Sequence, residues 1–170
     1  MASVKEDVLA ALAALGIPCE LLEHAPVHTM EDCKAAEEAL GGVMPKNLFL
    51  TPRNHASHHL LIARPDAPFR TSRISRQLGV SRLSFATAEE LMDMLRTLPG
   101  AISPMGLLFD KEKRVRLAID RALRGEERLL FHPCVNTATL AISGADFFER
   151  LLPALGHEAT YVDMQGEDDA

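Results

Sequence analysis

The chain has 170 residues, of which 47% are hydrophobic and 25% are charged, and its formal net charge is −6. These values are ordinary for a globular protein and fit one domain that spans residues 1–170. No apolar run approaches the ~20 residues of a membrane helix, and the N-terminus has no signal-peptide pattern. We therefore expect a cytoplasmic protein without a membrane partner.

The charge is unevenly distributed along the chain. Residues 64–128 contain 13 Lys and Arg against 9 Asp and Glu, a net +4, whereas the remaining residues carry −10. A basic segment in an acidic chain suits a small contact with a nucleic-acid end, because proteins that coat a duplex usually present an extensive basic face. A solvated helical surface would produce the same bias.

The cysteines and histidines indicate neither a disulfide framework nor a metal site. Cys19, Cys33 and Cys134 are widely spaced and include no C-x-x-C pair. His58 and His59 are adjacent in an expected strand and should point to opposite faces of its sheet. We expect no metal and no cofactor.

The first half of the chain predicts two helices, a short strand between them and a hairpin. Ser3 and Glu6 have the spacing of a capping box, and Pro26 forces a loop before the second helix. Two apolar runs flank a polar turn, which is typical of paired strands. The expected elements are helix 3–15, strand 19–23, loop 24–28, helix 29–40 and strands 47–51 and 59–63.

In the second half, glycine and proline mark the ends of elements. Residues 114–120 alternate between polar and apolar types, which predicts a strand, and Pro153 should kink the last helix or end it early. Helices and strands intermix without regular βαβ spacing, which indicates an α+β fold with a mixed sheet. The expected elements are helix 71–78, strand 83–85, helix 87–98, strands 114–120, 129–132 and 139–143, a helix from 143, strand 160–164 and a disordered acidic tail at 165–170.

Lys46 stands where a glycine-containing loop opens into an expected strand. A lysine in this position can direct its ammonium group into a cleft while the strand fixes its stem. An ordinary surface lysine beside a buried strand would give the same pattern, since lysines are rarely buried.

Three other segments carry groups that could form a site. The loop 99–106 contains two glycines and two prolines, and such a loop can present backbone N–H groups to an anion or a carbonyl oxygen; it matches neither a nucleophile elbow nor a P-loop. Residues 131–140 crowd polar groups between apolar runs, so these groups either pair with one another or face a cleft. The loop 24–29 holds two histidines and could equally be a structural cap.

Five motifs follow one another in a characteristic order. They are Glu23-His24-Ala25-Pro26-Val27-His28-Thr29 with Glu31, Lys46-Asn47-Leu48-Phe49-Leu50, Arg82-Leu83-Ser84-Phe85, Gly100-Ala101-Ile102-Ser103-Pro104-Met105-Gly106, and Phe131-His132-Pro133 with Asn136-Thr137-Ala138-Thr139. From about residue 5 to 164 the chain resembles the YbaK-like prolyl-tRNA editing domains. It most resembles their freestanding members, which hydrolyse alanyl-tRNA(Pro).

The resemblance implies an α+β fold with a mixed, barrel-like β-sheet flanked by helices. It also implies a deacylase that needs no cofactor and acts on the tRNA(Pro) acceptor end, with prolyl-tRNA synthetase as a second partner. The expected catalytic residues are Lys46, Gly100, His132 and Asn136, and the expected substrate-binding residues are His28, Asn47, Ala101, Ile102, Ser103, Pro104 and Thr137. The alternatives are editing of another amino acid, a binding module without turnover, and a structural partner of a synthetase or ribosome.

Overall fold

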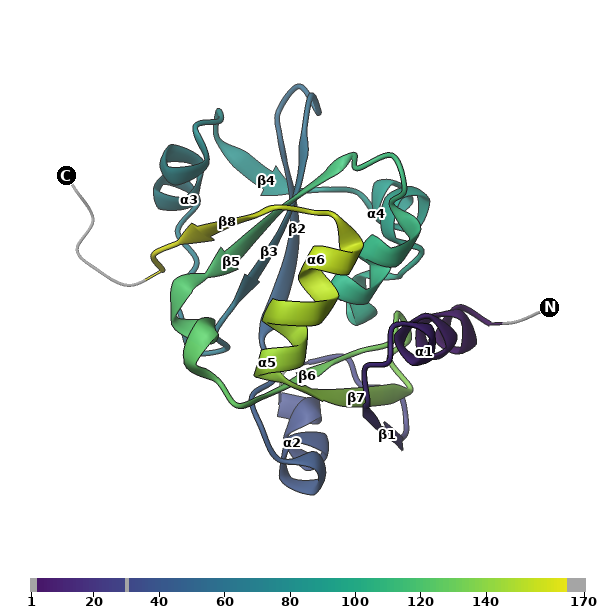
Figure 1. Ribbon diagram of the computed structural model, residues 1–170. Helices are drawn as coiled ribbons and strands as arrows, with labels where there is room; N and C mark the ends of the chain where they lie inside the picture. Colours follow the sequence, from purple (N-terminus) through teal and green to yellow (C-terminus); the bar gives the residue numbers. More distant parts are fainter. Residues whose placement is uncertain (1–2, 30, 165–170) are drawn as a thin grey trace.

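The computed structural model describes residues 3–29 and 31–164, which form two β-sheets with helices around them (Figure 1). The strands of the larger sheet are β2 (Lys46–Pro52), β3 (His58–Ala63), β4 (Leu83–Phe85), β5 (Val115–Asp120) and β8 (Ala159–Val162). They lie in the order β4-β2-β3-β5-β8. β2 pairs antiparallel with β3 and β4, whereas β5 pairs parallel with β3 and β8, so this sheet is mixed.

The smaller sheet is antiparallel and has the order β1-β7-β6. Its strands are β1 (Glu20–Glu23), β6 (Arg128–Phe131) and β7 (Ala138–Ser143). A single bridge between Val43 and Leu129 connects β6 to the segment that leads into β2. The start of β2 therefore lies beside the smaller sheet.

Helices cover both sheets (Figure 1). The α-helices are α1 (Val4–Ala14), α2 (Lys34–Leu40), α3 (Thr71–Leu78), α4 (Ala88–Leu95), α5 (Gly144–Asp146) and α6 (Leu152–Leu155). Short 3-10 turns are η1 (Glu31–Cys33), η2 (Pro99–Ala101), η3 (Pro104–Phe109) and η4 (Arg121–Gly125), and a π-helical turn, η5 (Phe147–Leu151), joins α5 to α6.

One hydrophobic core joins the two sheets. The helix from α5 to α6 runs between them (Figure 1). On this helix Phe147 is almost fully buried, and its ring centroid lies 5.0 Å from that of Phe131 in β6. Leu60 of β3 and Leu140 of β7 belong to the same buried cluster. Because interiors of this kind are close-packed, the shared core fixes the loop after β6 relative to the start of β2.

The expected fold class is confirmed, with one qualification about the sheet. The structure is α+β with a mixed sheet flanked by helices, but its two sheets are not closed into a barrel. The β2–β3 hairpin, helix 71–78 and strand 83–85 are all found where they were predicted. The expected tail at 165–170 lies outside the described residues.

One local prediction is wrong. The helix expected at 87–98 ends at Leu95, because Arg96 takes a left-handed conformation (φ 55°), and Leu98 is 61% exposed instead of packing on an apolar face. Pro153 is expected to kink the last helix or to end it early. The helix does not end there, since it continues to Leu155, but a π-helical turn interrupts its α-helical geometry just before Pro153.

Within residues 3–29 and 31–164, no helix combines the length and the hydropathy that crossing a membrane requires.

Candidate active site

A cleft of about 300 Å³ opens at the start of β2. Its walls come from the loop after β1, the β2 entry, the η2 turn and the end of β6. Six of the eleven expected site residues line it. They are His28, Lys46, Asn47, Gly100, Ile102 and His132.

Lys46 is the first residue of β2 and is partly buried. In the β2–β3 ladder it lies opposite Ala63, and its Nζ donates a hydrogen bond to the carbonyl oxygen of Ala67 in the connection that follows β3. An ammonium group carries three N–H donors, so two stay available to a ligand. The cleft lining among the described residues includes Lys46 but no Asp or Glu, which favours an anionic or carbonyl ligand.

Asn47 presents an acceptor next to Lys46. Its Nδ2 donates to the carbonyl oxygen of Pro45 at 3.3 Å, whereas its buried Oδ1 has no hydrogen-bond partner within the described part of the chain. A buried polar atom left unpaired costs about 1–3 kcal/mol.

Hydrogen bonds of Thr97 and Ser103 stabilise the turn from Gly100 to Pro104. Thr97 Oγ1 donates to the Ala101 carbonyl at 2.7 Å, and Ser103 Oγ accepts from the Met105 N–H at 3.1 Å. Ala101, Ser103 and Pro104 are buried and do not line the cleft, so they support its wall.

The front of this turn faces the cleft. Gly100 and Ile102 line it, and their N–H groups donate to no acceptor in the segments that the structure describes, whereas the Ala101 N–H is used inside the turn. Two such N–H groups at a cleft wall can receive an oxyanion or a carbonyl oxygen.

His132 follows β6 directly and is buried. Its Nδ1 donates to the carbonyl oxygen of Ala138 at 2.9 Å, which leaves Nε2 as the acceptor nitrogen of the neutral ring. Burial lowers the pKa of His132, and the neighbouring His24 lowers it further, against the opposing hydrogen bond to Ala138. His132 is therefore neutral near pH 7 and offers an acceptor to water or substrate.

Two hydrogen bonds join the loop after β1 to the loop after β6, beside His132. Asn136 Nδ2 donates to the carbonyl oxygen of Val27 at 3.0 Å, and the Val27 N–H donates to the Asn136 carbonyl at 3.1 Å. Asn136 is not part of the cleft lining, but its Nδ2 would lie 3.8 Å from a Cβ placed on Gly100. Thr137 is exposed, does not line the cleft, and accepts the N–H of His24 on its carbonyl oxygen. Asn136 thus lies at the rim of the site, whereas Thr137 contributes only its backbone carbonyl group, which binds the loop at His24.

The cleft contains no activated thiol among the residues described. Cys33 lines it, but burial, Glu37 and Asp32 raise the pKa of this thiol. Burial raises the pKa of Cys134, in the loop behind the cleft, to about 12. Both side chains are therefore protonated near pH 7 and poor nucleophiles, since the thiolate is the reactive form. The arrangement can bind an anion, polarise a carbonyl group and orient water.

Sequence reasoning missed several groups that shape the cleft. Val27, Met44 and Leu48 provide apolar lining, and the Ala67 carbonyl positions Lys46. Met44 and Leu48 flank Lys46 in the sequence and could have been found from that neighbourhood. The Ala67 carbonyl has no sequence signal, because any residue provides one.

Comparison with known proteins identifies the family. A family model described as the aminoacyl-tRNA editing domain matches residues 24–149, which include every described residue of the cleft. The chain is 31% identical over 160 residues to the prolyl-tRNA editing protein ProX of Acetoanaerobium sticklandii, covering 94% of this chain and 97% of that protein. It is 34% identical over 142 residues to prolyl-tRNA synthetase associated domain-containing protein 1 of Danio rerio, covering 82% and 77% of the two chains.

A solved structure agrees in fold. A crystal structure provisionally described as a trans-editing enzyme for prolyl-tRNA synthetase matches with a TM-score of 0.73, over 98% of this chain and 99% of that one, at 18% identity. At this identity the likeness shows the fold alone. The family model and the ProX relative, each matching most of the chain, show that the chain belongs to the aminoacyl-tRNA editing domain family.

Proposed function

We propose that this chain removes a wrong amino acid, most readily alanine, from mischarged tRNA(Pro) by attack of water on the aminoacyl ester. The observation that supports this most is the combination inside one cleft of Lys46, the Gly100 and Ile102 N–H groups and neutral His132. ProX, a prolyl-tRNA editing protein of nearly the same extent, supports action as a separate protein, in the cytoplasm where charged tRNA is used.

In this proposal each group has one task. Lys46 binds the phosphate or the carbonyl end of the terminal adenosine, and the N–H groups of Gly100 and Ile102 receive the ester carbonyl oxygen as it gains negative charge. His132 Nε2, with Asn136 at the rim, orients the attacking water. The water oxygen bonds to the carbonyl carbon, the bond from that carbon to the ribose oxygen breaks, and the water proton ends on the ribose oxygen. The products are a free amino acid and uncharged tRNA.

The ester itself explains why a site without a covalent nucleophile is sufficient. An aminoacyl ester is already activated, because the neighbouring ammonium group withdraws electrons from the carbonyl carbon. The protein therefore has to supply position and charge stabilisation, and correct positioning alone is worth about 7–11 kcal/mol in favourable cases.

The proposed selectivity rests on steric exclusion by the apolar lining of the cleft. Val27, Met44 and Leu48 provide this lining and would contact the side chain beside the ester. A site excludes a larger side chain sterically far better than it rejects a smaller one. Alanine should enter and the cognate proline should be largely excluded.

The test is a deacylation panel in which tRNA(Pro) is charged with Ala, Ser, Cys or Pro. We expect hydrolysis of alanyl-tRNA(Pro) and little hydrolysis of prolyl-tRNA(Pro), each corrected for spontaneous loss. Comparable rates on Ala and Pro would overturn the selectivity, and tight binding of charged tRNA without release of amino acid would replace the deacylase by a binding module. Capture of prolyl-tRNA synthetase, with and without ribonuclease, would test the second partner.

A further inference from the structure

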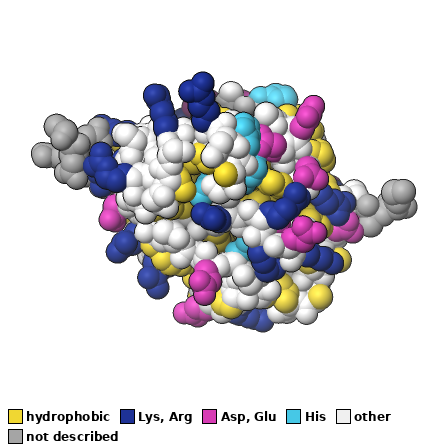
Figure 2. Space-filling view, turned by 90° about the horizontal axis from the view of Figure 1, so that it is seen from above, with side chains coloured by type: hydrophobic (Ala, Val, Ile, Leu, Met, Phe, Trp, Pro, Cys, Tyr) yellow, Lys and Arg dark blue, Asp and Glu magenta, His cyan; other side chains and the backbone are white. Residues whose placement is uncertain are grey.

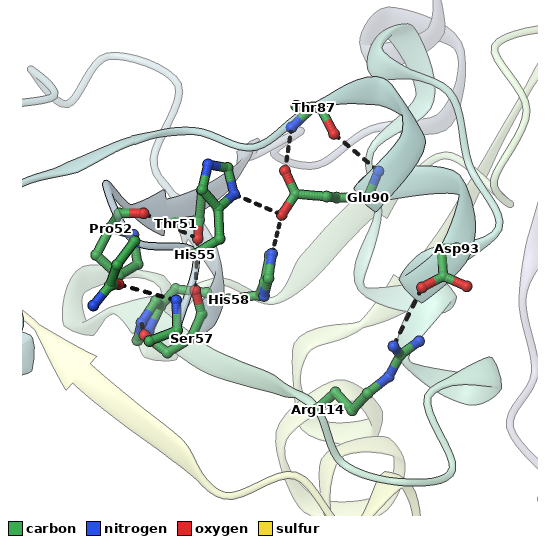
Figure 3. A network of polar contacts seen from close by, with 12 residues as sticks. Thr51, Pro52, His55, Ser57, His58, Thr87, Glu90, Asp93 and Arg114 are labelled. Carbon is green, nitrogen blue, oxygen red and sulfur yellow. Dashed lines mark hydrogen bonds and ion pairs between the residues drawn. The ribbon is translucent and has the colours of Figure 1, made fainter.

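A second cluster of ligand-type side chains lies at the other end of the β2–β3 hairpin (Figure 3). His55 and His58 come from the turn and the start of β3, and Glu90 comes from the first turn of α4. His55 Nδ1 lies 3.0 Å from Glu90 Oε2, and His58 Nε2 contacts the same oxygen. One potential ligand atom from each residue lies within 4.8 Å of the other two.

Local structure holds each of these side chains in place. Glu90 is part of a capping box, in which its Oε1 accepts the Thr87 N–H at 3.0 Å and its Oε2 turns toward the histidines. His58 is nearly buried and its ring stacks on Phe49, with centroids 5.7 Å apart. His55 has a left-handed backbone (φ 54°), and its N–H closes the turn by donating to the Pro52 carbonyl at 2.8 Å. In this turn the His55 side chain lies within reach of Glu90.

We propose that His55, His58 and Glu90 form a binding site for Zn²⁺, with water in the remaining position. Two imidazole nitrogens and one carboxylate oxygen are ligands that zinc accepts in proteins, whereas Mg²⁺ and Ca²⁺ take mainly oxygen ligands. The side chain of His55 is 50% exposed, so the cluster has an opening through which an ion and its water can enter. On the face seen in Figure 2, histidine side chains reach the surface beside acidic ones.

The cluster can admit an ion by a small movement. Ligands at zinc distances of about 2.0–2.1 Å in a tetrahedron lie roughly 3.4 Å apart, whereas both histidine nitrogens lie closer than this to Glu90 Oε2. An ion would therefore replace these two hydrogen bonds, and the histidine nitrogens would move slightly away from the carboxylate oxygen. His55 is the exposed member, so its side chain can rotate without moving buried residues.

The role of this site is structural, because it lies far from the cleft. Lys46 starts β2 and the turn follows Pro52, so the two sites are separated by the length of a seven-residue strand, about 20 Å at roughly 3.3 Å per residue. A bound ion would tie the hairpin turn to the start of α4. This site departs from the expectation of no metal: His59 does point elsewhere, with its Nε2 at 2.8 Å from Ser57 Oγ, but His58 finds its partners in His55 and Glu90.

The test is zinc binding by chelator-treated protein, measured by isothermal titration calorimetry with ZnCl₂ and by thermal melts with and without zinc. We expect one equivalent of zinc to bind and to raise the melting temperature. His55→Ala and Glu90→Gln should each bind zinc at least tenfold more weakly and lose the zinc-dependent shift. Arg53→Ala, in the same turn, and Glu89→Gln, beside Glu90 on α4, are matched controls that should behave as wild type.

Several outcomes would overturn the site. They are the absence of saturable binding at one equivalent, unchanged binding in His55→Ala, and equal binding of MgCl₂. Since Glu90 also caps α4, Glu90→Gln could lower stability by itself, and the exposed His55→Ala variant then decides. Deacylation plays no part in the measurement, so its result is independent of the proposed function.

Discussion

At the scale of single residues, the site depends on how its polar groups are paired. Lys46 and His132 each use one donor on a backbone carbonyl, of Ala67 and Ala138 respectively, and keep other atoms for a ligand. Asn47 keeps a buried oxygen without a described partner. Backbone carbonyls orient these side chains without bringing a second charge near the cleft, so the charge of Lys46 is not neutralised.

The protonation state of His132 predicts how the deacylation rate depends on pH. Its folded-state pKa lies below the ordinary value of 6.5, so the neutral form persists as the pH falls past 6.5 and is lost only as the pH falls through the lowered pKa. The single-turnover rate on alanyl-tRNA(Pro), corrected for spontaneous hydrolysis at each pH, should therefore show its acidic inflection below 6.5. His132→Gln should remove that inflection. An inflection at or above 6.5 in the wild type would mean that His132 is not the group that must be neutral.

The lowered pKa of His132 also makes the free energy of unfolding depend on pH. The direction is the one expected for a group whose pKa is lower in the folded chain than in the unfolded chain. The unfolded chain binds a proton at His132 more readily than the folded chain does, so this contribution is fully present above 6.5 and declines as the pH falls toward the lowered value. Acid should therefore destabilise the wild type more than it destabilises His132→Gln.

At the scale of elements, the cleft wall depends on how η3 packs on α4. A Cβ added to Gly106 would lie 2.6 Å from the Leu95 carbonyl oxygen, so only glycine allows this approach. A Cβ added to Gly100 would meet nothing closer than Asn136 Nδ2 at 3.8 Å, which is ordinary contact. The two glycines of the loop therefore serve different purposes, one in packing and one at the cleft surface.

Alanine substitutions at Gly106 and Gly100 should distinguish the role in packing from the role at the cleft surface. Gly106→Ala forces backbone apart and should lower the free energy of unfolding by about 1–3 kcal/mol, the usual cost of overpacking. Gly100→Ala should leave that free energy nearly unchanged while it reduces deacylation, because its methyl group enters the cleft. Denaturant melts and single-turnover rates on both variants measure this. Equal stability of the two variants would show that η3 can shift away from α4.

Local elements could be predicted because their signals are local. Gly79 ends α3 in a left-handed conformation, and Thr87 with Glu90 forms the capping box of α4, as their spacing indicates. What the sequence could not show are contacts between distant segments. Glu90 meets His58 across 32 residues, and Lys46 meets a carbonyl 21 residues away. Lys46 and His132 were assigned to one cleft through the family resemblance, since no spacing between them implies contact.

At the scale of the whole molecule, charge decides how a polyanion approaches an acidic protein. The basic excess in residues 64–128 includes Arg70, Arg76 and Arg82, which line a hollow beside the first turn of α3. Arg82 precedes Leu83, which pairs with Pro52 at the end of β2 opposite Lys46. A tRNA acceptor end with its terminal adenosine at Lys46 would have to extend along β2 to bring its phosphates to this hollow.

This path predicts a weak dependence on salt. Deacylation at subsaturating tRNA should fall as ionic strength rises, with a shallow slope, since each phosphate contact contributes only about 0.7–0.9 to the slope of log affinity against log salt. The double variant Arg76→Ala/Arg82→Ala should make the slope of deacylation rate against salt shallower still. The control variant Arg150→Ala should leave the slope unchanged, because Arg150 pairs with Asp146 on the last helix. A salt-independent rate in the wild type would exclude this route.

The most direct measurement of the central claim is single-turnover deacylation of alanyl-tRNA(Pro) by wild type, Lys46→Ala and Lys46→Arg, with thermal melts alongside. Loss of one positioned charge-stabilising group typically lowers the rate by about 10²–10³, and we expect this loss in Lys46→Ala. Its stability should change by only about 0.5 kcal/mol, because the side chain makes one hydrogen bond at the edge of the core. Arginine should restore activity only in part, since its planar fork places its donors differently. A Lys46→Ala variant that folds and deacylates at the wild-type rate would contradict the account.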